Sequence, residues 1–371
     1  MAIHYFDYNA TAPIRDEVVE LMAAEMRIVG NASAVHKSGQ RARGIVEKAR
    51  EQMGAFVNVE PNQIIFNSGA SEGNNTLIHG FVAQGYNVIV SDVEHPAVIK
   101  PSGERVHFIP VDENGVIQLE ALEALLAATP RPVLVSVMYV NNEAGIIQPV
   151  AEVGALCKKY EALFHTDAVQ AAGKISLDMD AMGADYITLS AHKYGGPQGI
   201  GVLAFAKGKP PPKLILGGSQ EGHQRAGTMN VAGIAGMWLA SEMAAQDIAH
   251  YESHIRPWRD DIERMLMDAK RQDGTPRVDI LAKDAPRVPN TSLFMIHDLK
   301  ADTLMMKADM AGICASSGAA CSSGTVKTSR TVAALRPNLS EPMPVMRLSM
   351  GWKTSQADVD AFIKFWHKLT A

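Results

Sequence analysis

Between about residues 60 and 205, short runs rich in valine and isoleucine alternate with segments of helical pattern, and this alternation constrains the fold more than any other feature. Each run is too short for a core helix, so we predict a strand at each. Helices between successive strands indicate βαβ units and a mostly parallel sheet covered by helices on both faces. The predicted strands span 63–67, 87–91, 105–111, 133–140, 162–167, 186–190 and 200–206, and the predicted helices span 38–56, 71–85, 117–128 and 149–163.

The last third of the chain has a different pattern. A long helix is predicted over 231–271, and the strands after it are separated by helices and loops rather than joined in regular βαβ units. We therefore predict a large α/β domain that ends near residue 250 and a smaller α+β domain after it. In the second domain the predicted strands span 278–281, 292–296 and 345–350, and the predicted helices span 301–312 and 355–371.

The composition of the 371 residues indicates a folded protein of a reducing compartment. Apolar residues make up 47% and charged residues 20%, which is enough to bury a large core. A net charge of −5 gives no reason to expect nucleic acid as a partner. The three cysteines form neither a CxxC pair nor a zinc spacing, so no metal site is predicted. Without a signal peptide or an apolar stretch of ~18–20 residues, we expect a cytoplasmic protein with no membrane partner.

Polar clusters follow several predicted strands, at the edge where open parallel sheets bind ligands. In 67–75 (NSGASEGNN), Ser71 stands where a helix begins, beside free amides that suit a phosphate. The alternative is an ordinary N-cap, in which the Ser71 hydroxyl accepts from the Asn74 N–H. His95 follows the next strand and is able to stack on a planar ligand or move protons, although a histidine before a proline is also a common turn residue.

Two further clusters have the same position. Asn142, in 140–145 (VNNEAG), suits hydrogen bonds to a ligand or a simple turn. Asp167 directly follows a predicted strand, with Gln170 three residues on. A carboxylate there is suited to a ligand's ring nitrogen or to capping a helix, and the sequence alone does not separate the two.

A lysine completes the set. In 188–201 (TLSAHKYGGPQGIG), Lys193 sits where a strand stops and glycines force a turn. Pyridoxal phosphate requires an amine for a Schiff base, a carboxylate facing the pyridine nitrogen, a flat group on the ring and a phosphate cradle. Lys193, Asp167, His95 and Ser71 offer one candidate for each role. Four unrelated turn residues would not be expected to fill four roles, so the joint interpretation is preferred.

Cys321 lies in 314–325 (CASSGAACSSGT), in the smaller domain. Small residues on both sides predict a mobile, exposed loop, so the thiol is a candidate nucleophile. The alternative is an inert buried cysteine, which is our interpretation of Cys157 and Cys314.

With these motifs assembled, the chain resembles cysteine desulfurases of the NifS/IscS type, in the class V aminotransferase family. That family has the aspartate-aminotransferase-like fold, fold type I of pyridoxal phosphate enzymes. The SSGxxC form of the cysteine loop is the most discriminating motif and is similar to the first desulfurase group. The motifs that carry the resemblance, in the family's order, are FDYNATAP, NSGASEGNN, EHPAV, VNNEAG, HTDAVQ, SAHKYGGPQGIG, RAGTMN, SSGAACSSGT and MRLSMGWKT.

The resemblance implies a domain division, a homodimer and a role for each residue. The large domain would span 14–250, and 1–13 would join 251–371 in the small domain. Lys193 would bind the cofactor and shuttle protons, and Cys321 would take the sulfur. His95 would stack on the cofactor ring, Asp167 would pair with the ring nitrogen, and Gln170 would bond the ring hydroxyl. The phosphate would be held by Ala70, Ser71, Ser190 and His192, and Thr228 would contact the phosphate of the neighbouring subunit. Asn142 and Arg347 would bind the substrate carboxylate.

The reaction implied is conversion of L-cysteine to L-alanine, with the sulfur passing to Cys321 as a persulfide. An iron–sulfur scaffold or another sulfur carrier protein would then accept it. Selenocysteine lyases, aminotransferases and β-lyases of the same fold remain alternatives, because they do not need Cys321. A non-catalytic binding or scaffold protein on the same fold is a third hypothesis, against which the retained Lys193, Asp167 and His95 argue.

Overall fold

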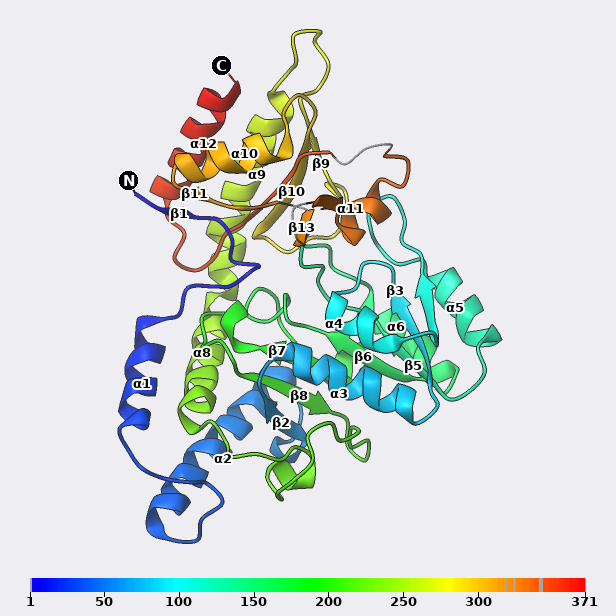
Figure 1. Ribbon diagram of the computed structural model, residues 1–371, viewed down its shortest axis with the longest axis vertical. Coiled ribbons are helices and arrows are strands. Elements are labelled where there is room, and N and C mark those ends of the chain that lie inside the picture. Colours follow the sequence, from blue (N-terminus) through cyan, green and yellow to red (C-terminus); the bar gives the residue numbers. More distant parts are fainter. Residues whose placement is uncertain (1, 318, 323–324, 340–342, 371) are drawn as a thin grey trace.

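The seven runs predicted as strands pair in a single sheet in the computed structural model, which describes residues 2–317, 319–322, 325–339 and 343–370. The sheet forms the core of the larger lobe (Figure 1). In spatial order its strands are β2 (Ile64–Asn67), β8 (Gly201–Phe205), β7 (Tyr186–Ser190), β6 (Leu163–Asp167), β5 (Val133–Ser136), β3 (Asn87–Ser91) and β4 (Val106–Ile109).

Strand direction brings the polar clusters together. Strand β8 runs antiparallel to both β7 and β2, whereas β7, β6, β5, β3 and β4 are mutually parallel. The carboxyl ends of β2, β3, β5, β6 and β7 therefore meet at one edge of the sheet, as predicted for an open α/β sheet.

Helices cover both faces of this sheet, and alternate strand residues divide between the two layers. In β3, for example, Val88 and Val90 pack with α3 and α4, whereas Ile89 packs in the core on the opposite face. One face is covered by α3 (Ala70–Ala83) and α4 (Pro96–Ile99), and the other by α1 (Asp16–Met26), α2 (Lys37–Val57), α5 (Leu119–Ala128), α6 (Val150–Lys159), α7 (Met179–Met182) and α8 (Val231–His250).

Two predicted elements are shorter or more interrupted than expected. The strand predicted over 133–140 ends at Ser136, and the residues beyond it continue along β6 through bonds such as that from the Tyr139 N–H to Asp167 O. The long helix predicted over 231–271 is α8, a π-helical turn over Tyr251–Ile255, and α9 (Arg256–Asp268). Pro257 lies in the first turn of α9, where it cannot donate the hydrogen bond that would continue α8 without a break.

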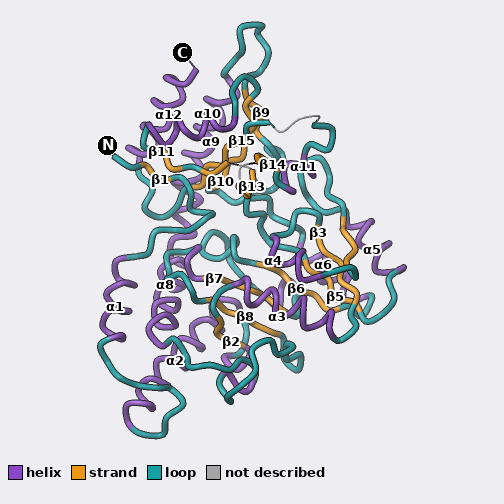
Figure 2. Tube along the Cα trace, viewed as in Figure 1, coloured by secondary structure: helices purple, strands orange, loops and turns teal. Residues whose placement is uncertain are grey.

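The smaller lobe has its own core. Its sheet has the order β12 (Ser316–Ser317), β15 (Val345–Ser349), β10 (Thr291–Ile296) and β9 (Val278–Ile280), with antiparallel neighbours. Figure 2 shows these strands well separated from those of the large sheet. The other elements of this lobe are β1 (His4–Tyr5), which pairs with β11 (Ile313–Cys314), and the helices α9, α10 (Ala301–Met310), α11 (Arg330–Leu335) and α12 (Gln356–Thr370).

The core of the large lobe ends within α8, and the core of the small lobe begins just after it. Ala244 belongs to the core of the large lobe, whereas Tyr251 and Ile255 belong to that of the small lobe, together with Phe6. The N-terminal segment runs from β1 in the small lobe to α1 beside α8 in the large one (Figure 1). Because the two cores divide in this way, we propose a large domain of residues 14–250 and a small domain of residues 1–13 and 251–371.

The described residues around Cys321, where a mobile, exposed loop is predicted, include two paired strands. Strands β13 (Ala319–Ser322) and β14 (Thr325–Thr328) are antiparallel, and Cys321 is opposite Val326. Threonine and valine in β14 favour an extended backbone. The Cys321 side chain lies outside the described part of the structure. Among the described helices, none combines the length and the apolar content that a membrane span requires.

Candidate active site

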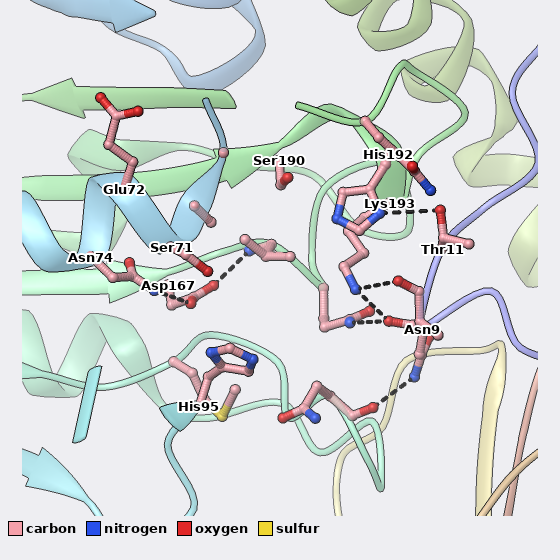
Figure 3. A pocket seen from close by; sticks show the side chains of 18 of the residues that line it. Asn9, Thr11, Ser71, Glu72, Asn74, His95, Asp167, Ser190, His192 and Lys193 are labelled. Atoms are coloured by element: carbon pink, nitrogen blue, oxygen red, sulfur yellow. Dashed lines mark hydrogen bonds between the residues drawn. The ribbon is translucent and has the colours of Figure 1, made fainter. Parts of the chain in front are cut away.

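One pocket of about 720 Å³ lies at the carboxyl edge of the large sheet, between that edge and the N-terminal segment (Figure 3). All but one of the described side chains predicted for the site line it. They are Ala70, Ser71, His95, Asn142, Asp167, Gln170, Ser190, His192, Lys193 and Arg347. Residues that the sequence analysis did not single out also line the pocket, including Asn9, Thr11, Glu72 and Asn74.

Lys193 is placed at the end of β7 by a single turn of 3₁₀ helix, Ala191–Lys193. Its Nζ donates to the backbone oxygens of Asn9, at 2.6 Å, and Ala10, at 2.8 Å. Burial, and to a smaller extent the positive charge of Arg347, lower the pKa of Lys193 to about 8. Near neutral pH a useful fraction of this amine is therefore unprotonated and nucleophilic.

Asp167 ends β6 and is buried, with both carboxylate oxygens held. Oδ2 accepts from Asn74 Nδ2 at 2.7 Å, and Oδ1 accepts from the Val169 N–H at 3.1 Å. Turns rather than a helix follow Asp167, so the helix-capping alternative is wrong. Asn74 lies on the second turn of α3, facing the pocket, one turn beyond Ser71 (Figure 3).

His95 is a turn residue whose ring faces the pocket. The residue caps α4, since His95 Nδ1 accepts from the Ala97 N–H at 3.1 Å, and its ring also lines the pocket. Because Nδ1 is the acceptor, the proton of the neutral ring is on Nε2. Burial is the largest cause of a lowered pKa at His95, and the charge of Lys193 adds to it, which favours the neutral ring.

The start of α3 is open to an anion. Gly69, at φ 142°, caps the helix without a side chain, and neither the Ala70 nor the Ser71 N–H has an acceptor among the described residues. The N-cap alternative for Ser71 is therefore wrong, because glycine takes the cap position two residues earlier. A Cβ on Gly69 would lie 3.5 Å from Ser190 Oγ, so that hydroxyl flanks the same amides. Free amides at a helix start form an anion site.

Thr228 lies apart from this pocket within one chain. It lines a neighbouring hollow together with Arg225, beside Ser68 and Gly199, which border both spaces. Arg225 forms two hydrogen bonds to Glu72, at 2.9 and 3.2 Å. Burial raises the pKa of Glu72, but hydrogen bonds from Arg225 and Ser68 outweigh it, so the pKa is lowered overall.

A buried amide network, which sequence reasoning missed, supports one side of the pocket. Gln170 Nε2 donates to Asn9 O at 2.9 Å, and Gln170 Oε1 accepts from Lys174 Nζ at 2.7 Å. Lys174 is 1% exposed and also donates to Asn9 Oδ1. Burial lowers the pKa of Lys174 well below its ordinary value, with the charges of Lys193 and Arg347 adding to it. In the sequence, the one feature that could have drawn attention to Lys174 is its position four residues after Gln170.

Arg347 and Asn142 face the pocket from opposite lobes. Arg347 is in β15 and donates from Nη1 to Asn142 O at 3.0 Å and from Nη2 to Asp7 Oδ1 at 2.5 Å. Its Nε is buried with no partner in the described structure. Asn142 lies in the turn between Asn141 and Ile146. His192, by contrast, directs Nδ1 to Thr11 Oγ1, at 3.1 Å, and burial lowers its pKa to about 4, with Lys193 adding to it.

The segment that carries Cys321 is anchored beside the pocket at both ends. Ser316 pairs with Arg347 across β12 and β15, five residues before Cys321. At the other end, Thr331 Oγ1 accepts from Asn141 Nδ2 at 3.2 Å. Cys157 is buried at 1% exposure, as predicted, but Cys314 is half-buried in β11 rather than enclosed in the core.

The sheet order and the lysine at the end of β7 define an α/β protein of the aspartate-aminotransferase-like class, fold type I. A family model described as aminotransferase class-V matches residues 4–362. The chain belongs to that family.

Two curated relatives are named cysteine desulfurases. The chain is 34% identical to "Cysteine desulfurase IscS" of Dictyoglomus turgidum over 96% of its own length and 91% of the relative's. It is 35% identical to a cysteine desulfurase of Sinorhizobium fredii, over 97% and 94%. A solved NifS-like protein from Rickettsia africae superposes with a TM-score of 0.90 at 32% identity, covering 99% of each chain. These relatives confirm the resemblance seen in the motifs.

Proposed function

We propose that the protein is a pyridoxal phosphate-dependent cysteine desulfurase, which converts L-cysteine to L-alanine and takes the sulfur onto Cys321. One observation carries the proposal. The buried amine of Lys193 shares a single pocket with Asp167, His95, the open start of α3 and Arg347. Each group that pyridoxal phosphate requires has a counterpart there.

The donor set fits this cofactor. The free amides of Ala70 and Ser71, with the Ser190 hydroxyl beside them, suit the phosphate. Asp167, whose oxygens are both oriented, suits the protonated ring nitrogen, and His95 suits the ring face. Among the described residues Gln170 Nε2 donates only to Asn9 O, so the second N–H of the amide suits the ring hydroxyl.

When bound, pyridoxal phosphate supplies the electron sink that weakens bonds at the α- and β-carbons of the amino acid. Arg347 holds the substrate carboxylate through its guanidinium, with Asn142 beside it, which fixes the amino acid in one orientation. Lys193 would hold the cofactor through its amine, and as a base of pKa near 8 it would take up and return a proton beside the substrate.

Cys321 accepts the sulfur of the substrate. Its thiolate forms an S–S bond to the substrate sulfur while the C–S bond of the substrate breaks, and the carbon takes a proton to give alanine. The products are alanine and a Cys321 persulfide, so the step needs no external oxidant or reductant. The short distance along the chain supports this assignment. Ser316 pairs with Arg347 at the pocket, and Cys321 is only five residues further on.

The assembly proposed is a homodimer with shared sites. Thr228 borders the phosphate side of the pocket without lining it, which is a suitable position for contacting the partner's phosphate. A cytoplasmic setting suits a catalytic thiol, which must stay reduced between turnovers. We propose a protein sulfur acceptor, an iron–sulfur scaffold or a sulfur carrier, because a persulfide must be handed on.

The test is an assay for alanine and sulfide from L-cysteine with added thiol. We expect wild type to form both, and Cys321→Ser to lose at least about 99% of turnover while it still binds the cofactor. Cys157→Ser and Cys314→Ser are matched controls and should keep their activity. Persulfide on Cys321 should be detectable by mass spectrometry in wild type and in the two control variants.

Other outcomes favour the related enzymes. If Cys321→Ser keeps its turnover, a transaminase or β-lyase replaces the proposal. If selenocysteine is turned over and cysteine is not, a selenocysteine lyase does. A protein that stays colourless after addition of pyridoxal phosphate would support the non-catalytic hypothesis.

A further inference from the structure

A chain of buried hydrogen bonds runs behind Asp167, away from the pocket. Ser136 Oγ is 2.8 Å from His165 Nδ1, and His165 Nε2 is 3.2 Å from Thr188 Oγ1. Thr188 Oγ1 is 2.6 Å from Asn74 Oδ1, and Asn74 Nδ2 is 2.7 Å from Asp167 Oδ2. The chain therefore joins β5, β6, β7 and α3 and ends on the pocket carboxylate.

The first three members of the chain do not touch the pocket. Ser136, His165 and Thr188 are each 0% exposed, and none of them lines the cavity, whereas Asn74 and Asp167 do. Strand register explains the arrangement, since His165 is opposite Ser136 on one side and Tyr186 on the other, and Thr188 is opposite Asp167. Two hydrogen bonds, through the Thr188 hydroxyl, connect the His165 ring to Asn74, the amide partner of Asp167.

Hydrogen-bond chemistry allows two self-consistent directions for this chain. In the first, Ser136 O–H donates to His165 Nδ1, His165 Nε2–H to Thr188, Thr188 O–H to Asn74 Oδ1, and Asn74 N–H to an ionised Asp167. In the reverse direction, a protonated Asp167 donates to a flipped Asn74, and every later bond turns round, which leaves the proton on His165 Nδ1. The tautomer of His165 therefore reports the direction of the whole chain.

A charged imidazolium fits neither direction. With protons on both nitrogens, His165 would donate to Ser136 as well as to Thr188, and no carboxylate of the described residues bonds to the ring to offset the charge. Full burial lowers the pKa of His165 to about 3, so the ring is neutral at any physiological pH. Neutrality leaves the tautomer as the one open choice.

We propose that His165 is a positioning residue, held as the Nε2–H tautomer, which directs the hydrogen bonds from Ser136 toward Asp167 and so keeps that carboxylate ionised and turned to the pocket. The arrangement leaves both Asp167 oxygens as acceptors, from Asn74 and from the Val169 N–H. Its consequence for the cofactor rests on the proposed function, in which Asp167 faces the ring nitrogen.

The direct test is nitrogen NMR on apoprotein labelled with ¹⁵N in the histidine rings. The signal of His165 is the one that disappears in His165→Asn. We expect a protonated Nε2 and an unprotonated Nδ1, unchanged across the neutral range. A signal from Nδ1–H, or from a ring protonated on both nitrogens, would overturn the proposal.

A pair of variants at Thr188 tests the effect on the site. Thr188→Val removes the hydroxyl and keeps the shape, including the methyl that packs on Gly73, whereas Thr188→Ser keeps the hydroxyl. The dissociation constant for pyridoxal phosphate should rise by about tenfold in Thr188→Val, the usual effect of a lost buried hydrogen bond, and recover to within about threefold of wild type in Thr188→Ser. Equal constants in the two variants would contradict the proposed positioning role.

The two proposals fail in different ways. If the protein binds no pyridoxal phosphate but His165 shows the Nε2–H tautomer, the function is wrong and the direction of the chain stands. If wild type forms alanine and sulfide from cysteine and the tautomer is Nδ1–H, the function stands and the positioning role fails. Should Thr188→Val not fold, the NMR result on wild type and on Thr188→Ser still decides.

Discussion

Lys193 Nζ lies 2.6 Å from the backbone oxygen of Asn9, a residue 184 positions earlier in the chain. The same oxygen accepts from Gln170, and the Asn9 side chain bonds Lys174, Asn290 and Thr291. The N-terminal segment thus connects the lysine at the end of β7 to both lobes. A shift of the Asn9 backbone should therefore alter the hydrogen bonds of the Lys193 amine.

The first prediction concerns the pH dependence of cofactor attachment. The folded pKa of Lys193 is lowered to about 8, so below that pH most of the amine carries a proton and cannot attack an aldehyde. The rate at which apoprotein binds pyridoxal phosphate covalently should rise about tenfold per pH unit below about 8 and level off above it. Stopped-flow absorbance measures this rate, and Lys193→Arg, which keeps the charge, should show no covalent phase. A break near the ordinary lysine value would contradict the effect of burial.

The second prediction concerns stability and Lys174. This amine loses its proton well below its ordinary pKa when folded, but keeps it to about 10.4 in the unfolded chain. Between those values the unfolded state binds one more proton, so the free energy of unfolding of wild type should rise with pH relative to Lys174→Met, by up to about 1.4 kcal/mol per unit.

Urea denaturation at several pH values above neutrality measures the difference for Lys174→Met. Lys158→Met, which removes an exposed lysine on α6, is the matched control and should follow wild type at every pH. Parallel curves for wild type and Lys174→Met would show that the buried amine stays charged.

The buried amide network also shows where sequence reasoning stopped. The strand 87–91 was predictable because its three central residues, Val88, Ile89 and Val90, are all apolar and β-branched. Lys193 was predictable because glycines mark the turn after β7. The partners of Asn9 come from positions that only the folded chain brings together. No local pattern in the sequence encodes a bond across 165 positions, such as that from Lys174 to Asn9.

The N-cap alternative for Ser71 failed for a local reason. Serine is a suitable N-cap by residue type, but Gly69 adopts φ 142° and takes the cap, which moves Ser71 into the first turn. Backbone geometry, which residue type constrains only weakly, decided this outcome.

The third prediction concerns the substrate carboxylate. Arg347 is held by Asn142 O and Asp7, so its guanidinium is already oriented toward the pocket. Arg347→Lys keeps the charge but loses the planar pair of donors, so KM for cysteine should rise at least about tenfold while kcat changes less. Arg264→Lys, at an exposed site on α9, is the control. An unchanged KM would mean that another cation binds the carboxylate.

The last prediction is a double-mutant cycle on Glu72 and Arg225. Glu72 lines the pocket beside the open start of α3, where its negative charge would repel a phosphate if Arg225 did not offset it. Arg225→Met should therefore weaken pyridoxal phosphate binding by about tenfold, whereas Glu72→Gln alone should change it by less than about threefold. Because glutamine removes the repulsion, the double variant should bind within about threefold of wild type. Equilibrium titration of the four apoproteins gives the dissociation constants. If the double variant is instead as weak as Arg225→Met, the arginine acts on the phosphate directly, and the carboxylate has no part in the effect.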